Sequence, residues 1–156
     1  MHISNIRIEN FRSIQHVDMH FSEFSILVWQ NNHGKTNFFD AIDWFDSARK
    51  TSVTDKLTLA EEVEIEITYK WAQQWLADMQ NEKNRTSIKN LIWENDVVAI
   101  RKNSADHKRY FIIDWVQQSN PTGFDSALND FLPKMEYVRA TAKLSEVSKY
   151  ASRSEE

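Results

Sequence analysis

One short segment of the sequence constrains the fold more than any other. Residues 24–28 form an apolar run, and a polar loop that ends in Gly34-Lys35-Thr36 follows it. Apolar residues then recur at the spacing of one helix face, at Phe38, Ala41, Ile42 and Phe45. A strand buried on both faces, joined to an amphipathic helix by such a loop, is the setting of the phosphate-binding pattern GxxxxGK(S/T). The segment therefore predicts an α/β fold of the P-loop class.

The chemistry of this pattern identifies candidate site residues. Backbone N–H groups of the loop and of the helix N-terminus point at phosphate groups, and the helix dipole favours their negative charge. Lys35 is expected to bridge the β- and γ-phosphates, and the Thr36 hydroxyl to coordinate Mg²⁺. ATP and Mg²⁺ are thus the expected cofactors. The residues expected to bind the nucleotide are Gln30, Asn31, Asn32, His33, Gly34, Lys35, Thr36 and Asn37.

The first position of the loop departs from the pattern, because Trp29 stands where the first glycine belongs. Glycine allows a close approach of the backbone to a ligand, which tryptophan opposes. The chain has two glycines and six tryptophans in 156 residues, whereas average usage of about 7% predicts roughly eleven glycines. We hypothesise that several tryptophans replace glycines: Trp29 above all, and also Trp71, Trp75, Trp93 and Trp115. Trp44, inside the predicted helix, suits its position.

The rest of the chain predicts a sheet with helices. Alternating residues indicate strands over 6–11 and 17–21 joined by a hairpin loop at 12–16, and the clearest period-2 strand covers 63–69. Further predictions are a helical or irregular stretch over 71–92, strands over 97–100 and 110–113, and helices over 125–132, with Asp125 as N-cap, and near 144–150. We divide one partial ATP-binding domain, 1–156, into a core over 1–50, antiparallel strands over 60–118 and a C-terminal helical segment over 125–156.

Composition excludes several classes of protein. The net charge of −4 provides no overall attraction to nucleic acid. The absence of cysteine excludes disulfides, thiolate zinc sites and cysteine nucleophiles, and suits a reducing cytoplasm. No apolar run is long enough for a secretory signal or a spanning helix. We therefore expect a cytoplasmic protein without a membrane partner.

The N-terminal residues resemble a known family. The segment from Ile6 to Ile14, Ile-Arg-Ile-Glu-Asn-Phe-Arg-Ser-Ile, precedes a second strand and then Ile26-Leu27-Val28-x-x-Asn31-Asn32-x-Gly34-Lys35-Thr36-Asn37-Phe38-Phe39-Asp40-Ala41-Ile42. This succession is similar to the N-terminal lobe of ABC-type ATPase heads, in the RecF, OLD and structural-maintenance-of-chromosomes groups of AAA-like ATP-binding proteins. The resemblance implies a mixed sheet with an antiparallel part and flanking helices, and it makes Arg12 a second candidate nucleotide contact. The alternative for Arg12 is an ordinary solvated arginine in a hairpin loop.

The resemblance also implies an activity and partners. Such heads bind ATP, dimerise, and act in DNA repair, DNA maintenance or phage defence. Self-association, a partner ATPase or nuclease subunit, and DNA are the implied partners. With Gly34 and Gly123 as its only glycines, the chain contains no double-glycine signature, so we expect no hydrolysis by this chain alone. The alternative is a nucleotide-inactive interaction module that retains the P-loop fold.

Three other patterns have competing interpretations. Tyr110 to Asp114 resembles a Walker B strand, but Trp115 follows where the family has glutamate, which favours an antiparallel strand that ends in a turn. Lys102, His107, Lys108 and Arg109 form a basic cluster, which is either a phosphate contact or a solvated turn. The acidic row Glu62, Glu64 and Glu66 is expected on a solvated strand face. Motifs of GTPases, and histidine spacings of metal sites, are absent from the sequence.

Overall fold

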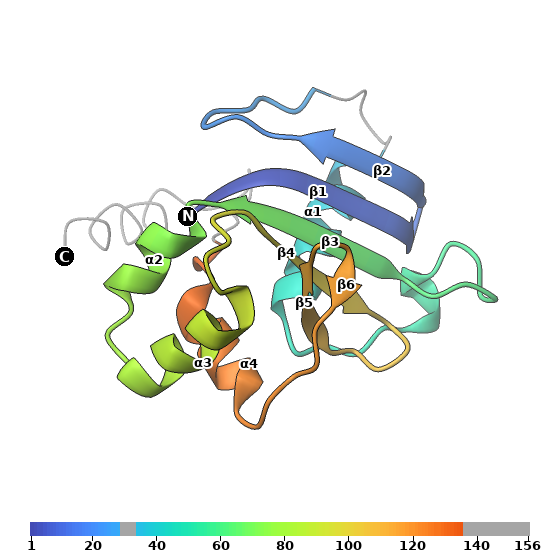
Figure 1. Ribbon diagram of the computed structural model, residues 1–156. Coiled ribbons are helices and arrows are strands. Elements are labelled where there is room, and N and C mark those ends of the chain that lie inside the picture. Colours follow the sequence, from blue (N-terminus) through green and yellow to red (C-terminus); the bar gives the residue numbers. More distant parts are fainter. Residues whose placement is uncertain (29–33, 136–156) are drawn as a thin grey trace, which may run out of the picture.

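The computed structural model describes residues 1–28 and 34–135, which form a twisted sheet with helices packed on one face (Figure 1). The order of the six strands is β2-β1-β3-β4-β5-β6, and every pairing among them is antiparallel. The strands are β1 (His2–Phe11), β2 (Ile14–His20), β3 (Glu64–Lys70), β4 (Val98–Asn103), β5 (Arg109–Ile113) and β6 (Val116–Gln117). This confirms the predicted antiparallel part and the strands at 6–11, 17–21, 63–69, 97–100 and 110–113.

The central strand β3 shows how alternation builds the sheet. Ile65, Ile67 and Tyr69 are fully buried under the helices. Glu64 and Glu66 lie on the opposite face, where Arg101 of β4 is within 3.3 Å of Glu64 Oε1 and 2.7 Å of Glu66 Oε2. Successive side chains of a strand point to opposite faces, so one face is apolar and the other carries cross-strand ion pairs. The predicted acidic face is therefore an ion-paired one.

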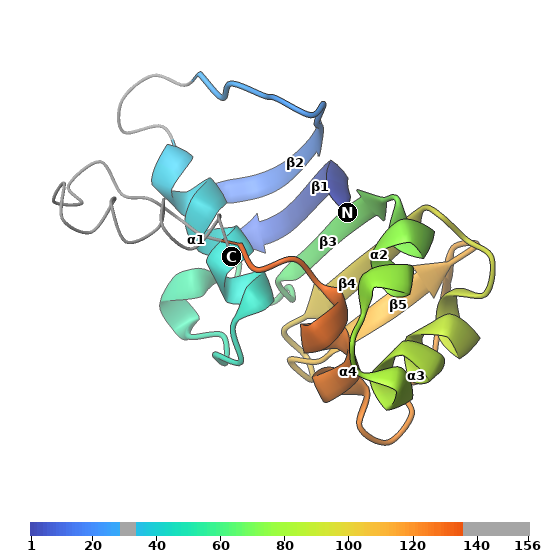
Figure 2. The ribbon, with the colours of Figure 1, turned by 90° about the vertical axis from the view of Figure 1, so that its left-hand side faces the viewer.

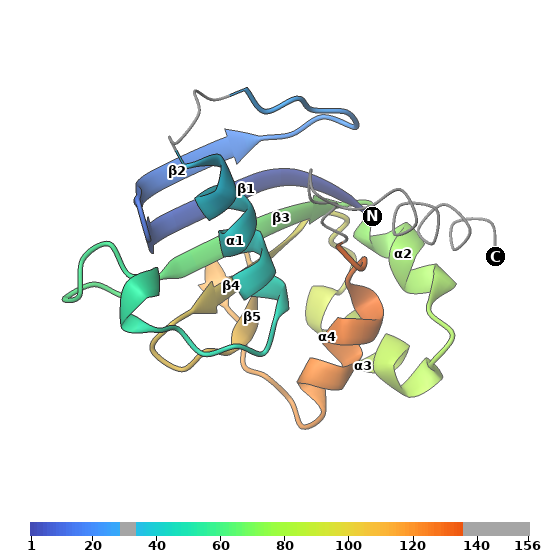
Figure 3. The ribbon, with the colours of Figure 1, turned by 180° about the vertical axis from the view of Figure 1, so that it is seen from behind.

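The helices cover the apolar face of the sheet. Seen from behind, α1 crosses β1 and β3, which it contacts, and α4 lies on the same face of the sheet (Figure 3). α3 packs against α4, and α2 precedes α3 along the same side (Figure 2). Phe111 of β5 meets Phe124 and Phe131 of α4 edge-on, with ring centroids 5.7 and 5.9 Å apart. The helical elements are α1 (Lys35–Asp46), the 3₁₀ turn η1 (Val53–Asp55), α2 (Ala72–Asp78), α3 (Glu82–Ile92) and α4 (Phe124–Phe131).

The prediction of a buried strand at 24–28 is wrong. These residues form no strand, and Phe24, Ile26 and Val28 are 79%, 73% and 85% exposed. A strand buried on both faces needs partners on both edges. None of the six described strands pairs with this run, because β2 has β1 as its only partner in the described sheet. Of this run, Leu27 packs against the core, and the described residues leave Phe24, Ile26 and Val28 largely exposed.

Two boundaries also differ from the sequence prediction. The first hairpin has a two-residue loop, Arg12-Ser13, instead of a loop over 12–16. Gly123, with φ 83°, is the N-cap of α4, so Asp125 lies inside the first turn. The stretch expected to be helical near 144–150 lies outside the described residues. None of the described helices is long and apolar enough to cross a membrane.

Candidate phosphate-binding site

The start of α1 is an uncapped helix N-terminus that begins at a left-handed glycine. Gly34 is the N-cap residue with φ 98° and ψ 1°, and no side chain caps the helix. A Cβ added to Gly34 would lie 3.5 Å from Ser13 Oγ, an ordinary contact. Glycine is therefore needed here for its left-handed backbone and not for space. The first turn of α1 contains no acidic residue, so nothing in that turn opposes an anion at the positive end of the helix dipole.

The hairpin between β1 and β2 is held against this helix start. The Asn37 side-chain amide donates a 2.7 Å hydrogen bond to Ser13 Oγ. Arg12 Nη1 lies 3.5 Å from Asn37 Oδ1. The two residues of the hairpin loop thus both contact the first turn of α1, although more than twenty residues separate them in sequence. The sequence predicted Arg12 and Asn37 as site residues but not Ser13. The feature that could have indicated Ser13 is its position directly after Arg12.

Arg12 is an ion-paired residue. Its guanidinium pairs with Asp40 of α1, and Nε lies 3.4 Å from Asp55 Oδ1. The Arg12 backbone N–H also donates to the Asp55 carbonyl oxygen at 2.8 Å. Arg12 thus lies in the hairpin loop, as the alternative expects, but its partly exposed guanidinium is ion-paired. If Arg12 contacts the nucleotide, a phosphate group would share its guanidinium with Asp40 and Asp55 or displace them.

Asp55 is the buried anchor of this group. It accepts hydrogen bonds from Arg49 Nη1 at 2.5 Å, Ser52 Oγ at 2.8 Å and the Ser52 backbone N–H at 3.0 Å. Burial alone would raise the pKa of Asp55, but the bonds from Arg49 and Ser52 outweigh it and hold the pKa far below that of an ordinary aspartate. Asp55 is ionised throughout the physiological range. No periodic pattern marks it in the sequence, so sequence reasoning missed both Asp55 and Asp40.

A small hollow of about 180 Å³ adjoins the start of α1. Its lining combines the hairpin and β2 with the helix start: Ser13, Ile14, Gln15, His16, Val17, Gly34 and Phe38. Thr36 is exposed and Lys35 is partly buried beside it. The predicted residues Gly34, Lys35, Thr36, Asn37 and Arg12 are thus brought together. Trp29, Gln30, Asn31, Asn32 and His33 lie outside the described residues, and their roles stay predictions.

Comparison with known proteins identifies the family. A family described as "AAA ATPase domain" matches residues 1–147. The chain belongs to this family. It is 32% identical over 94 residues to the DNA replication and repair protein RecF of Pasteurella multocida (strain Pm70), which covers 56% of this chain and 26% of that protein. It is 44% identical over 43 residues to RecF of Nitrosococcus oceani, over 27% of this chain and 12% of that protein. The matched regions therefore span about a quarter of the length of the first relative and about an eighth of the second, 26% and 12%.

A solved structure shows the same fold. It is described as "Structural biochemistry of ATP-driven dimerization and DNA stimulated activation of SMC ATPases", and it superposes with a TM-score of 0.57 at 18% identity. The superposition covers 97% of this chain and 91% of that one. Together with the family match, it confirms the resemblance to the N-terminal lobe of ABC-type ATPase heads of the RecF and structural-maintenance-of-chromosomes groups, within the AAA ATPase domain family.

The described residues fit a Mg²⁺-bound nucleoside triphosphate. Gly34 turns the backbone into a helix start without a capping side chain, and Thr36, one residue after Lys35, is exposed. When bound, the ion would neutralise phosphate charge. Lys35 and the amides at the start of α1 would hold the phosphates, and Thr36 would hold the metal. The groups of His, Asp and Glu in the described part of the chain provide no separate metal cluster.

The other sequence candidates do not join this site. Asp114 follows β5 in the turn to β6, and β5 is antiparallel to β4, so the turn interpretation of Tyr110 to Asp114 is confirmed. Lys102 is fully buried, and Arg109 is buried with Nη2 2.5 Å from Asn129 Oδ1. The interpretation of the basic cluster as an exposed phosphate contact or a solvated turn is wrong for these two residues.

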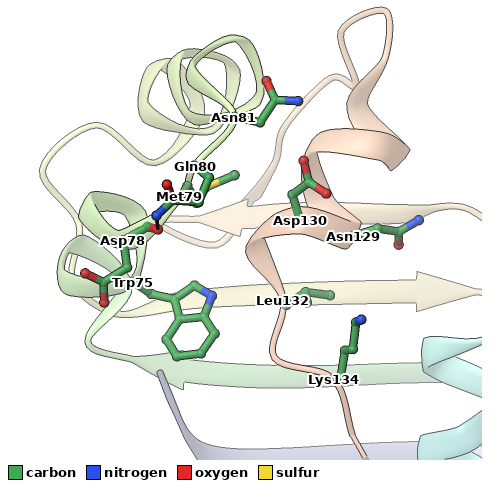
Figure 4. Close-up of a pocket in the computed structure, with 9 residues that line it drawn as sticks. All are labelled: Trp75, Asp78, Met79, Gln80, Asn81, Asn129, Asp130, Leu132 and Lys134. Carbon is green, nitrogen blue, oxygen red and sulfur yellow. Dashed lines mark hydrogen bonds between the residues drawn. The ribbon is translucent and has the colours of Figure 1, made fainter. Parts of the chain in front are cut away.

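A larger hollow of about 630 Å³ lies on the α2 and α4 side (Figure 4). Its lining residues are Trp75, Asp78, Met79, Gln80, Asn81, Asn129, Asp130, Leu132 and Lys134. None of them belongs to the loop segment or to the hairpin that contacts it. The Asp130 carboxylate at its rim already accepts a hydrogen bond from Asn84. This hollow is separate from the candidate phosphate site.

Proposed function

We propose that the chain is the ATP-binding N-terminal part of a DNA-associated ABC-type ATPase head that works by ATP-dependent dimerisation. The observation that carries the proposal is the helix start at Gly34, where a left-handed glycine, an uncapped helix N-terminus and the Arg12-Ser13 hairpin meet. Family membership supports ATP as the ligand. The RecF relatives, which are DNA replication and repair proteins, support a role in DNA repair or maintenance, with DNA as a partner. A role in phage defence and a cytoplasmic location remain part of the proposal.

The division of labour follows from the site. Lys35 and the backbone amides of α1 bind the phosphates, and Thr36 positions Mg²⁺. Asp55 holds the hairpin in place through Arg12 and Arg49. A second head, or a partner ATPase or nuclease subunit, supplies the signature residues that the chain does not contain. The chain alone therefore binds ATP and does not turn it over.

Equilibrium titration with a fluorescent ATP analogue tests the proposal. We expect Mg²⁺-dependent binding that is lost in Lys35→Ala and weakened in Thr36→Ala. Lys83→Ala removes an exposed lysine of α3 and serves as the matched control, because it has the same charge change far along the sequence from the loop. Unchanged affinity in Lys35→Ala would refute the phosphate-site assignment.

The alternative function is a nucleotide-inactive interaction module. Trp29 at the first loop position is the observation that favours it. Titration of both the chain and its Trp29→Gly variant separates the two functions. Tight binding by both proteins supports the ATP-binding head, and binding by neither supports the interaction module. Binding by Trp29→Gly alone would show that Trp29 is what makes the chain inactive. Sedimentation with and without ATP then tests dimerisation, which the first function requires and the second does not.

A further inference from the structure

Three tryptophans of this chain have left-handed backbone conformations. The φ angles of Trp71, Trp93 and Trp115 are 63°, 52° and 67°. Only a few per cent of non-glycine residues have positive φ, and Asn, Asp and His are several-fold enriched among them. If each of the five described tryptophans had that chance, three positive values would arise on the order of once in a thousand chains. The coincidence therefore needs a common cause.

Each of the three positions is one where glycine is the usual residue. Asp114 and Trp115, with φ 49° and 67°, form the two-residue loop between β5 and β6. Positive φ at both positions defines a type I′ turn, for which Asp-Gly is a preferred pair. Trp93 ends α3 with φ 52° and ψ −121°, the mirror image of the first central residue of a type II turn, a position dominated by glycine. Trp71 links β3 to α2 with φ 63° and ψ 35°.

The side chains offer little in compensation, and the described ring contact among the three is that of Trp71 with His2, whose centroids lie 5.3 Å apart. Trp71, Trp93 and Trp115 are 42%, 73% and 91% exposed. Trp44, in contrast, is fully buried in α1 and packs against Phe11. A strained backbone persists when the surroundings over-determine it. The mostly exposed rings of Trp93 and Trp115 provide no such support, and Trp71 has one tilted ring contact. The two glycines of the chain, Gly34 and Gly123, also have positive φ, 98° and 83°.

We propose that the natural protein has glycine at positions 71, 93 and 115, and that position 29 belongs to the same set. Glycine at 29 would complete GxxxxGK(S/T), since Trp29 occupies its first position in the sequence. Trp44 is a genuine tryptophan of the core. Trp75 lies inside α2, where the backbone makes no demand for glycine, and is not included. The proposal goes beyond the proposed function and does not rest on it.

A single codon explains why one residue type replaces another at several separate places. UGA is read as stop, as tryptophan or as glycine in different genetic codes. We infer that positions 29, 71, 93 and 115 are encoded by UGA, that the natural host reads it as glycine, and that the printed sequence has it read as tryptophan. Independent mutations would instead have to replace glycine with tryptophan several times, each time at a position where the backbone favours glycine. The departure of Trp29 from the phosphate-loop pattern and the shortage of glycine in the chain then have the same cause.

The coding DNA and the protein from its host provide the direct test. We expect UGA at codons 29, 71, 93 and 115 and UGG at codon 44. Peptide mass spectrometry of the host protein should find glycine at the four positions and tryptophan at 44. UGG at all of these codons, or tryptophan in the host peptides at 71, 93 and 115, would overturn the proposal.

Paired glycine and alanine variants test the backbone argument without nucleotide. Both remove the indole ring, so the difference between them isolates the demand for positive φ. At positions 71, 93 and 115 the glycine variant should melt about 2 to 4 °C above the alanine variant. At position 75 the order should reverse, because glycine is the poorer helix former. If the alanine variants melt at the same temperature as the glycine variants or higher at all three positions, the proposal is contradicted, whatever the chain binds.

Discussion

The Lys102 ammonium nitrogen lies 4.4 Å from the centroid of the Trp44 ring and donates a 2.6 Å hydrogen bond to the Trp44 carbonyl oxygen. It also donates to the Ser47 carbonyl oxygen at 2.5 Å. The lysine of β4 thus satisfies two carbonyl groups at the C-terminal end of α1, where a positive charge also complements the helix dipole. Burial, with repulsion from Arg109 and Arg49, lowers the pKa of Lys102 to about 8.

This pKa predicts that stability rises with pH above about 8. The folded pKa of Lys102 lies below the unfolded value, so the unfolded chain binds more protons between the two values, and unfolding becomes harder as pH rises. We expect the free energy of unfolding to increase from pH 7 to pH 9 by roughly 1 kcal/mol. Urea unfolding at several pH values checks this. Lys102→Met should lose the increase, and Lys83→Met, at an exposed site, should keep it.

The ion pairs of Asp55 predict that stability beside the phosphate site is sensitive to acid. Asp55→Asn removes the charge that pairs with Arg49 and Arg12, and we expect a loss of about 3 kcal/mol, as for other broken buried ion pairs. The pKa of Asp55 is depressed in the folded state, so its contribution is present above about pH 4 and is lost as pH falls further. Acid unfolding of wild type should therefore be steeper than that of Asp55→Asn. Asp114→Asn, in an exposed turn, is the matched control and should follow wild type.

The hydrogen bond between Ser13 and Asn37 predicts energetic coupling between the hairpin and α1. Ser13→Ala and Asn37→Ala should each lower the free energy of unfolding by about 0.5 to 1.5 kcal/mol. In a double-mutant cycle the combined variant should lose less than the sum, because both single changes remove the same 2.7 Å bond. Chemical denaturation of the four proteins gives the coupling energy. Simple additivity would show that the hairpin and the helix start are energetically independent.

Local patterns in the sequence predicted most of the helices and strands. They did not predict the contacts between residues that are far apart in the sequence. The alternation over 63–69 and the helical spacing after Gly34 each reflect a periodicity that a single segment carries, and both elements exist. The run at 24–28 shows the limit of composition, since apolar residues are buried only where another surface meets them. The predicted site residues that are described lie together, but Ser13, Asp40 and Asp55 join them through contacts across 24 to 43 residues. The burial of Lys102 was hidden for the same reason, because its charge pattern resembles a solvated turn.

Asn10 shows what a left-handed residue looks like when the fold supports it, and it allows a last prediction. Asn10 is buried with φ 53°. Its side-chain amide donates to the carbonyl oxygens of Thr58 at 2.9 Å and Glu61 at 2.8 Å, and its Oδ1 accepts from the Thr58 N–H at 2.6 Å. Asn10→Ala should lower the free energy of unfolding by about 2 to 4 kcal/mol, because it leaves buried polar groups without partners and keeps the strained backbone. Asn10→Gly loses the same bonds but relieves φ, so it should be about 1 kcal/mol more stable than Asn10→Ala. Guanidinium unfolding of the two variants measures the difference, and equal stability would mean that hydrogen bonding alone determines this residue.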